Sequence, residues 1–372
     1  MPSTTNILTH LGEMPVETFL SDYWQQQPLL LRNAFTNFPT IDPEELAGFS
    51  LEEDVESRIL LETPKTDPLQ SQWQLLNGPF DLNTFEQLPK DHWTLLVQAV
   101  DQLHPDIHAL LQQFRFIPNW RVDDIMVSYA TNGGSVGPHF DYYDVFLLQA
   151  HGRRRWRLGQ QCTASSPLRT DTECKILTQF HAVEEWTVEP GDLLYIPPNL
   201  AHWGVADEEC VTYSIGFRAP SHGDILLDYS QDLAANLSAD QRFTDAGRTF
   251  NVDSGQIRQE DIQRVVDILK PMLTDEIALR DWFGRYMTQK RRESPQFEVP
   301  QNSHSVRLAA GSRAAYFAVK QNQAILYING EQFECDPAFA QQVCNYQAIE
   351  LDSLELAERE LVHRFIDNEW LL

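Results

Sequence analysis

The sequence predicts a mainly β protein with added α-helices: a β-sandwich or barrel, then a helical region, then a small unit of strands and helices. Three observations predict this fold class. Short alternating apolar runs, separated by Gly, Pro and Asn, fill residues 120–220. Apolar residues at spacings of three and four follow in residues 222–296. Beyond residue 297, two strand-like runs joined by a turn precede two helix-like segments.

Length and composition set limits on this arrangement. The chain has 372 residues, which suggests two or three domains, and 42% of them are hydrophobic, enough for a substantial core. No stretch approaches the roughly 20 apolar residues that a membrane span needs, and the N-terminus lacks the apolar segment of a secretory signal. Five widely spaced cysteines without a Cys-x-x-Cys motif favour free thiols in a reducing compartment. We therefore expect a cytoplasmic protein without a membrane partner.

The charge of the chain is strongly negative. Fifty-four acidic side chains against 28 basic ones give a net charge of −26. Such a surface repels phosphate backbones, so no direct nucleic-acid binding is expected, and it attracts a strongly basic partner. Solubility, or adaptation to a salty environment, explains the same charge equally well.

The first 90 residues mix helix and turn signals. Residues 14–20 and 24–31 suggest a helix that runs into a short strand. Pro43 is expected to open a second helix with Asp42 as its N-cap. The first predicted domain spans residues 1–221, with its barrel core at about 90–221.

The strands of the predicted barrel follow in the middle third of the chain. Each is a short apolar run bounded by turn residues, as in sandwiches and barrels. The runs are Ile125–Ala130, Val145–Gln149, Arg153–Leu158, Leu193–Ile196 and Val211–Phe217.

Residues 222–296 form the predicted helical region. Ile225–Tyr229 and Ile262–Leu269 carry apolar residues at helical spacings. A helical block with little barrel to cover is a candidate homodimer element, or else it packs on its own chain.

The last predicted domain, residues 297–372, follows the polar linker Arg292–Gln296. Asn329-Gly330 is a strong hairpin signal between strands. The strand signals are Tyr316–Val319 and Ala324–Ile328, and the helix signals are Asp336-Pro337 and the segment from Ser353 to the C-terminus. Strands plus two helices in this length suggest a small winged-helix-like domain.

Three side chains form a candidate metal site. His139 and Asp141 are two residues apart, so in an extended segment they point to the same side. His202 lies just past the apolar strand Leu193–Ile196. Two histidines and one carboxylate are the facial triad of non-haem iron(II) oxygenases. A His-x-Asp pair alone arises easily by chance among 11 histidines and 54 acids, so the strand before His202 adds most of the weight.

A basic run in the barrel region contains one arginine that strand alternation turns inward. Arg153, Arg155 and Arg157 share one face of the strand, whereas Arg154 shares the other with Trp156 and Leu158. A buried guanidinium stays charged and needs an anionic partner, best a carboxylate taken bidentately. The partner is either a buried Asp or Glu of the protein or the distal carboxylate of a small diacid that also chelates the metal.

Small hydroxyl side chains accompany this arginine by the same alternation. Ser128 faces away from Val127 and Tyr129, and Thr212 faces away from Val211 and Tyr213. Inside a barrel, such hydroxyls are either hydrogen-bonded core residues or ligand contacts.

At these residues the chain resembles the JmjC-type, cupin-like 2-oxoglutarate oxygenases, and more narrowly the bacterial ribosomal-protein arginine hydroxylases, which are ribosomal oxygenases. The resemblance covers the middle third of the chain. It is carried by Gly137–Phe146, Gly152–Arg157, Gly191–Pro198 and Tyr213–Pro220. It implies a double-stranded β-helix (jelly-roll) barrel, a helical dimerisation region and a C-terminal winged-helix-like domain, in the order predicted above.

The resemblance also implies roles for single residues. His139, Asp141 and His202 become the catalytic iron ligands, and Arg154 pairs with the far carboxylate of 2-oxoglutarate with help from Ser128. The family often has Asn where this chain has Thr212, so a contact of the shorter Thr212 side chain with 2-oxoglutarate is an open expectation.

The implied reaction consumes 2-oxoglutarate and dioxygen, releases succinate and carbon dioxide, and hydroxylates a C–H bond. The family's substrate is an arginine, hydroxylated at its β-carbon, in the basic large-subunit ribosomal protein L16. Asp144, Tyr142 and Tyr143 lie close to the metal ligands in sequence, and an acid there is a candidate to attract that guanidinium; a structural role is equally open for each of the three. Alternatives are a histidyl hydroxylase or demethylase, a metal-binding cupin without oxidative chemistry, and a transcriptional regulator. The acid-rich C-terminal segment argues against the last.

Overall fold

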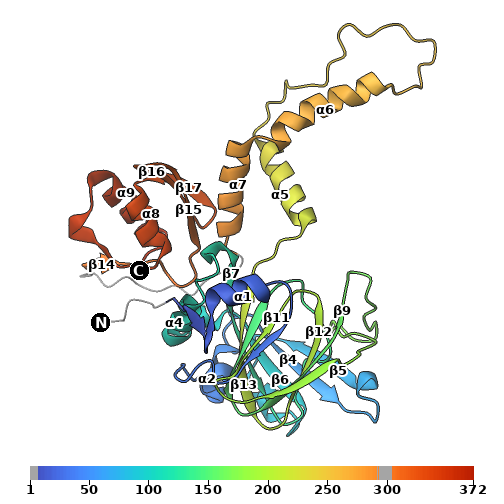
Figure 1. Cartoon of the computed structure of the whole chain (residues 1–372), viewed down its shortest axis with the longest axis vertical. Helices are drawn as coiled ribbons and strands as arrows, with labels where there is room; N and C mark the ends of the chain where they lie inside the picture. Colours follow the sequence, from blue (N-terminus) through green and yellow to red (C-terminus); the bar gives the residue numbers. More distant parts are fainter. Residues whose placement is uncertain (1–6, 291, 293–303) are drawn as a thin grey trace.

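The computed structural model describes residues 7–290, 292 and 304–372. Figure 1 shows three parts: a β-rich body, a helical arm that extends away from it, and a small C-terminal unit beside the base of the arm. Within the described residues, no helix is long and apolar enough to cross a bilayer. All five cysteines are free thiols, as expected.

The β-rich body is a sandwich of two antiparallel sheets. The larger sheet has eight strands in the order β3-β11-β8-β13-β7-β6-β4-β5, and the smaller has three in the order β10-β9-β12. The larger sheet consists of β3 (Leu29–Leu31), β4 (Ser57–Thr63), β5 (Gln72–Asn77), β6 (Trp93–Val97), β7 (Val122–Ala130), β8 (Val145–His151), β11 (Leu193–Ile196) and β13 (Cys210–Phe217). The smaller consists of β9 (Arg154–Gln161), β10 (Glu184–Val188) and β12 (Leu200–Ala206). The predicted barrel is confirmed, and each of its five expected strands is present with slightly different ends.

Strand alternation divides the larger sheet into two apolar faces. Phe146 and Leu148 of β8 point outward into the main core, where short helices cover the sheet. Val145 and Leu147 of β8 point inward and pack with Trp156 of β9. The covering helices are α1 (Val16–Asp22), α2 (Pro43–Phe49), α3 (Leu82–Glu86) and α4 (Pro105–Gln113), with the small strands β1 (His10–Leu11) and β2 (Met14–Pro15) before them. The inward face therefore bounds an interior between the two sheets.

The N-terminal elements agree with the sequence expectations. The expected helix running into a strand is α1 followed by β3. Asp42 caps α2, because its carboxylate accepts a hydrogen bond from the Glu44 amide at 2.8 Å and Pro43 occupies the first turn.

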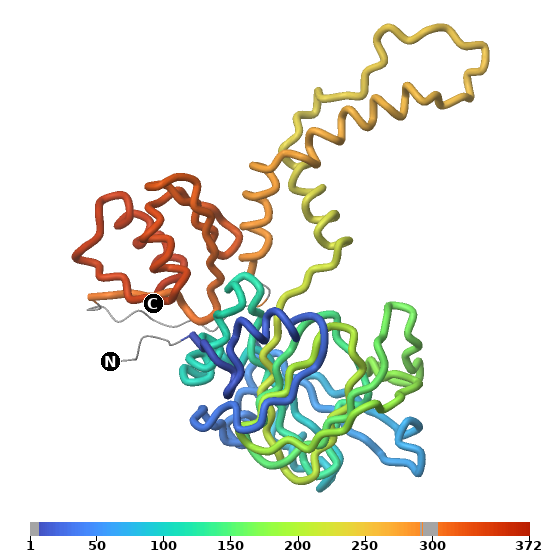
Figure 2. Tube along the Cα trace, viewed as in Figure 1, coloured from blue at the N-terminus to red at the C-terminus, as the bar shows by residue number. Residues whose placement is uncertain are grey.

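The helical arm comprises α5 (His222–Ala235), α6 (Gln259–Leu273) and α7 (Glu276–Thr288). Ser221 and Asp224 form a capping box that begins α5. In Figures 1 and 2, α6 and the segment 236–258 reach far from the sandwich. No residue of α6 is buried.

The C-terminal unit has a hairpin-based sheet with helices on it. Asn329 and Gly330 both have positive φ (48° and 88°), as a two-residue type I′ hairpin turn requires, and they join β16 to β17. Asp336 caps α8 as expected, and the helix predicted from Ser353 begins at Leu356 after a 3₁₀ turn. The elements are β14 (Ser305–Val306), β15 (Ala314–Lys320), β16 (Gln323–Ile328), β17 (Glu331–Cys335), α8 (Pro337–Cys344), β18 (Ile349–Glu350) and α9 (Leu356–Asp367). Of the predicted linker, residues 293–296 lie outside the described residues.

Helix α7 packs on this C-terminal sheet. A Cβ added at Gly284 of α7 would lie 2.4 Å from the ring of Tyr327, so glycine allows this close approach. Tyr327 also donates a hydrogen bond to Asp281 of α7 at 2.9 Å. The last helix of the arm is therefore packed against the strands that follow it.

Two arginines fasten the C-terminal unit to the sandwich. Arg115, which follows α4, donates to the carbonyl of Asn345 at 2.9 Å. Arg313 reaches in the opposite direction and donates to the carbonyls of Val122 and Asp123, at 2.6 Å each. This reciprocal contact fixes the C-terminal unit against the end of β7.

Candidate active site

The structure brings His139, Asp141 and His202 together at one end of the sandwich. An isolated bridge joins their backbones, because His139 donates to the His202 carbonyl at 3.0 Å and His202 donates back at 2.8 Å. Asp141 Oδ2 lies 3.9 Å from Nε2 of His139 and 3.6 Å from Nε2 of His202. One ligand atom from each of the three lies within 4.8 Å of the others. This is the spacing of a three-ligand metal site.

The two imidazoles are oriented by their own backbones. Nδ1 of His139 lies 2.9 Å from the Gly137 carbonyl, and Nδ1 of His202 lies 2.9 Å from the Leu200 carbonyl. Both carbonyls accept a hydrogen bond from Nδ1–H, which leaves Nε2 of each ring free for an ion. Burial, and then the neighbouring His139, lower the pKa of His202 to about 4. His202 is therefore neutral at physiological pH, the form that binds metal.

The conformation of the loop that carries His139 is fixed by close packing and by hydrogen bonds. Gly137 has φ +79°, and a Cβ there would lie 2.9 Å from the side chain of Ile176. Ser135 ties this loop to the strand of His202: its hydroxyl donates to the Gly204 carbonyl at 2.7 Å and accepts from Trp203 Nε1 at 3.1 Å. His202 is thus held on β12 between strand β9 on one side and the loop of His139 on the other.

Arg154 points into the interior, as strand alternation predicts. It is 4% exposed, and its guanidinium lies 5.8 Å from the ring of Trp156 on the same face of β9. Its Nε and Nη2 have no hydrogen-bond partner among the described residues, and Nη1 reaches only Ser128 Oγ, at 3.5 Å. In the described part of the chain, no carboxylate forms an ion pair with it. A buried cation with two unused donors fits an anionic ligand.

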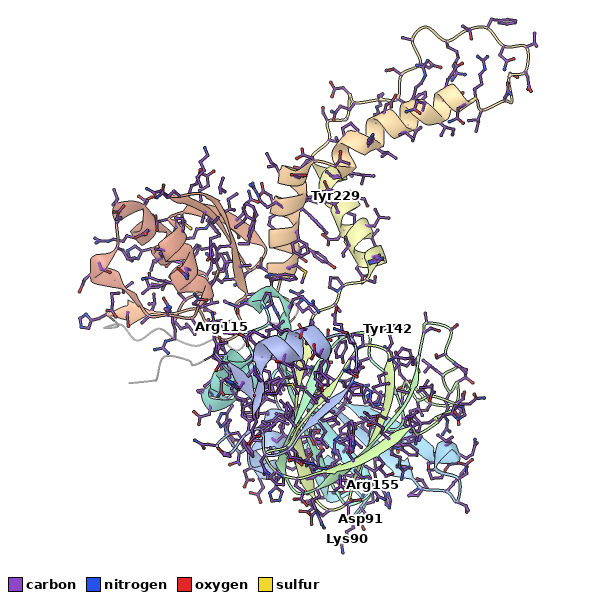
Figure 3. All side chains as sticks on the ribbon, in the orientation of Figure 1. Lys90, Asp91, Arg115, Tyr142, Arg155 and Tyr229 are labelled. Carbon is purple, nitrogen blue, oxygen red and sulfur yellow. The ribbon has the colours of Figure 1, made fainter. Side chains whose placement is uncertain are left out.

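The other arginines of the run point outward. Arg153 pairs with Glu208 at 3.1 Å, Arg155 with Asp207 at 2.6 Å, and Arg157 with Glu185 at 2.8 Å. Figure 3 shows Tyr142, next to the metal ligand Asp141, at the end of the sandwich near the arm, and Arg155, next to Arg154, toward the opposite end. The run is therefore no basic patch. His202 of β12 pairs with Leu158 of β9, whereas Arg154 lies four residues earlier in β9, opposite Ala206, so the metal site and Arg154 are separated along the strands.

Ser128 and Thr212 also lie inside, 2% and 1% exposed. They are cross-strand partners on β7 and β13. The Ser128 hydroxyl donates to the Thr212 carbonyl at 3.3 Å, and the Thr212 hydroxyl donates to Gln149 Oε1 at 3.0 Å. We did not single out Gln149 from the sequence, although its even spacing from Val145 and Leu147 is the signal that places it inside.

Asp144 has an internal role. Its buried carboxylate accepts hydrogen bonds from Gln25 Nε2 at 2.9 Å and Tyr195 Oη at 2.7 Å, and it pairs with Arg121 at 3.3 Å. Burial raises the pKa of Asp144. These partners occupy the carboxylate, so Asp144 is not placed to attract a ligand guanidinium. Tyr142, by contrast, is 57% exposed beside the metal site.

Comparison with known proteins finds similar proteins for both the sandwich and the C-terminal unit. A family model described as "JmjC domain" matches residues 109–225, and one described as "ROXA-like winged helix" matches residues 271–371. The Escherichia coli ribosomal protein uL16 3-hydroxylase is 32% identical over 84% of this chain and 80% of its own length. A probable ribosomal oxygenase of Haemophilus influenzae is 32% identical over 95% of this chain and 86% of its own length.

Solved structures of Escherichia coli YcfD have the same fold. One superposes with a TM-score of 0.84 at 26% identity, covering 97% of this chain and 98% of YcfD. Another, of YcfD as a ribosomal oxygenase in complex with cobalt and 2-oxoglutarate, has a TM-score of 0.81 at 27% identity, covering 98% and 99%. The match extends over the sandwich, the arm and the C-terminal unit.

Proposed function

Because this chain belongs to the JmjC family of ribosomal oxygenases, we propose that it is an Fe(II)- and 2-oxoglutarate-dependent arginine hydroxylase of the large-subunit ribosomal protein uL16. The reaction oxygenates the β-carbon of one arginine and releases succinate and carbon dioxide. The observation that carries this proposal is the buried guanidinium of Arg154, which lacks an acidic partner in the described chain, across the interior from the metal site.

The metal site His139, Asp141 and His202 suits iron. Two imidazoles and one carboxylate on one side of an ion leave its remaining positions open for a chelating co-substrate and dioxygen. The related YcfD complex holds cobalt with 2-oxoglutarate, and we take cobalt there as a stand-in for Fe(II). When bound, the iron supplies the oxidative chemistry, and the protein supplies positions and a dry interior.

The two ends of 2-oxoglutarate are assigned to different groups of the protein. We assign its far carboxylate to Arg154, whose Nε and Nη2 are the unused donors, with Ser128 beside it and Thr212 in the same wall. Apolar side chains from both sheets, among them Leu147 and Trp156, pack together on the inward faces, and such a lining would exclude water from the bound co-substrate. A diacid satisfies both ends of this interior, since one end is a metal site and the other a cation.

The substrate assignment rests on charge and on the relatives. A net charge of −26 steers a basic protein toward the enzyme, and uL16 is the substrate named for the Escherichia coli relative. Histidyl hydroxylation or demethylation is the second candidate, because a relative named for both activities is 24% identical over half of this chain. A cupin without oxidative chemistry gives no reason to bury Arg154. Because the proposed substrate is a ribosomal protein, we expect a cytoplasmic enzyme.

The test is direct oxidation of a peptide. The full chain is loaded with iron and 2-oxoglutarate without oxygen, then exposed to oxygen with uL16 fragments and, separately, with histidine-containing ribosomal peptides. We expect a gain of about 16 mass units on an arginine, the mass of one inserted oxygen. A gain on histidine, or loss of methyl groups from a methylated peptide, would transfer the assignment to the second candidate. No turnover of 2-oxoglutarate with any peptide would refute the oxygenase itself.

We further propose that residues 222–296 form a homodimer contact through α6. Four apolar residues recur along it at spacings of four, three and four, and each is more than a third exposed: Ile262, Val266, Leu269 and Leu273. They make one stripe on a helix that reaches away from its own sandwich (Figure 2). Soluble monomers rarely expose a continuous apolar stripe of this kind, and a second copy would cover it with an identical stripe.

A further inference from the structure

One buried polar side chain, on the strand that precedes Arg154, has no role in the assignment above. Gln149 is completely buried on the inward face of β8. Its Nε2 donates to the carbonyls of His151 at 2.7 Å and Gly152 at 3.3 Å, and its Oε1 accepts from the Thr212 hydroxyl at 3.0 Å. Both ends of the amide are thus used. A buried amide is costly in an apolar interior unless it is hydrogen-bonded, and these three bonds satisfy the amide while they tie together the groups that it contacts.

At its nitrogen end, Gln149 holds the turn between β8 and β9. Gly152 lies in that turn with φ +62°, and a Cβ there would lie only 2.0 Å from the Glu209 carbonyl, so the turn is closely packed. Arg154 begins β9 two residues later. The hydrogen bonds of Gln149 to the turn therefore fix the backbone from which the guanidinium projects.

At its oxygen end, Gln149 accepts the hydrogen bond that the Thr212 hydroxyl donates. A carboxylate accepts hydrogen bonds and donates none. With its proton on Gln149, Thr212 has no donor left for a carboxylate. The Ser128 hydroxyl is held less firmly, at 3.3 Å from the Thr212 carbonyl, and is free to turn toward a ligand. The donors left for a carboxylate are then Nε and Nη2 of Arg154 and the hydroxyl of Ser128.

We propose that Gln149 is a positioning residue of the 2-oxoglutarate pocket, acting through the β8–β9 turn on Arg154 and through Thr212 on the pocket wall. This proposal rests on the proposed function, since it presumes that Arg154 receives the far carboxylate. It predicts an effect on 2-oxoglutarate and none on the metal, because no contact of Gln149 reaches a metal ligand in the described structure.

The test uses Gln149→Met, which keeps the length of the side chain and removes its hydrogen bonds. The full chain is loaded with cobalt and titrated with 2-oxoglutarate by calorimetry, and the iron form is assayed for KM and kcat. We expect the Kd and KM for 2-oxoglutarate to rise about tenfold. This is the change expected when an equilibrium loses the net contribution of about one hydrogen bond. The kcat at saturating 2-oxoglutarate and the affinity for cobalt should stay within about twofold of the unaltered protein.

The matched control is Gln112→Met. Gln112 is a buried glutamine of α4, 4% exposed, on the far side of the larger sheet from the pocket. Its replacement tests for general damage and should leave the Kd for 2-oxoglutarate unchanged. An unchanged Kd in Gln149→Met, or an equal rise in both variants, would overturn the proposal.

A double-mutant cycle with Thr212→Val tests the route through Thr212. If Gln149 and Thr212 act as one unit, the double variant should bind 2-oxoglutarate about as well as the weaker single variant. Full multiplication of the two losses would contradict that route. If Gln149→Met does not fold, Gln149→Glu replaces it; the added charge should weaken 2-oxoglutarate binding, and unchanged binding would overturn the proposal. Failure of the unaltered cobalt protein to bind 2-oxoglutarate would refute the proposed function as well, so the two failures are distinct.

Discussion

Arg154→Met should weaken 2-oxoglutarate binding and, at the same time, stabilise the protein without its co-substrate. The change keeps an unbranched side chain of similar length and removes the guanidinium. In the described structure that guanidinium is 4% exposed, has no acidic partner and leaves Nε and Nη2 unpaired. A buried cation in this state costs free energy in the unliganded protein and returns it when an anion arrives.

The magnitude follows from the two unused donors. Removing one partner of a buried, hydrogen-bonded ion pair costs about 3–5 kcal/mol, so the Kd for 2-oxoglutarate should rise by about two to nearly four orders of magnitude. Without 2-oxoglutarate, Arg154→Met should raise the free energy of unfolding by about 1–3 kcal/mol, because a buried unpaired charge is replaced by an apolar side chain.

Two measurements on one preparation test this. Calorimetry on the cobalt-loaded protein gives the Kd for 2-oxoglutarate, and thermal unfolding without 2-oxoglutarate gives the change in stability. Arg155→Met is the matched control: this neighbour lies on the outer face, is paired with Asp207 at 2.6 Å and is partly exposed, so its removal should change neither quantity by much. A fall in the stability of unliganded Arg154→Met, or a Kd like that of the control, would refute the reasoning.

Three further predictions concern the metal, the dimer and a buried acid. Asp141→Asn should lower the affinity for cobalt about 100-fold or more, measured by competition with a chelator, since an amide replaces the charged ligand. Ile262→Glu with Leu269→Glu should give a monomer in light scattering at concentrations where the unaltered chain is a dimer; an unchanged mass would reject the α6 contact. Burial, and then Asp124, raise the pKa of Asp101, so its ionisation destabilises the folded state as pH rises past the ordinary carboxyl range. Asp101→Asn should therefore stabilise the protein by about 1–3 kcal/mol at pH 8 and by less at pH 5 in urea unfolding, and an equal gain at both would contradict this.

The sequence predicted the order of structural units because each has its own local signal. Period-two alternation marked the strands, turn residues such as Asn329-Gly330 marked the hairpin, and Asp42 marked a helix start. The sequence contains no such local signal for which surface a helix will cover. Helix α7 is the last helix of the arm but packs on the C-terminal sheet, because Gly284 allows contact with Tyr327, and that contact joins residues far apart in the sequence.

Alternation also explains which parts of the site were predictable. It turned Arg154 inward and its neighbours outward with no knowledge of the fold, because a strand has only two faces. It says nothing about partners from distant segments. Asp144 was a candidate ligand contact from the sequence, yet Gln25 and Tyr195, far from it in the chain, occupy its carboxylate.

Long-range pairing also separates Arg154 from two other buried charges of the sandwich, Asp144 and Asp192. Asp144 and Asp192 are as buried as Arg154, but the fold supplies Asp144 with Arg121 and Asp192 with Arg32. A buried charge that has an ion-pair partner within the protein has a structural role, since its partner is present in every molecule. A charge that the fold buries and leaves unpaired lowers stability in every molecule until a ligand arrives. That difference, which only the structure reveals, is why Arg154 is assigned to the co-substrate and Asp144 to the framework.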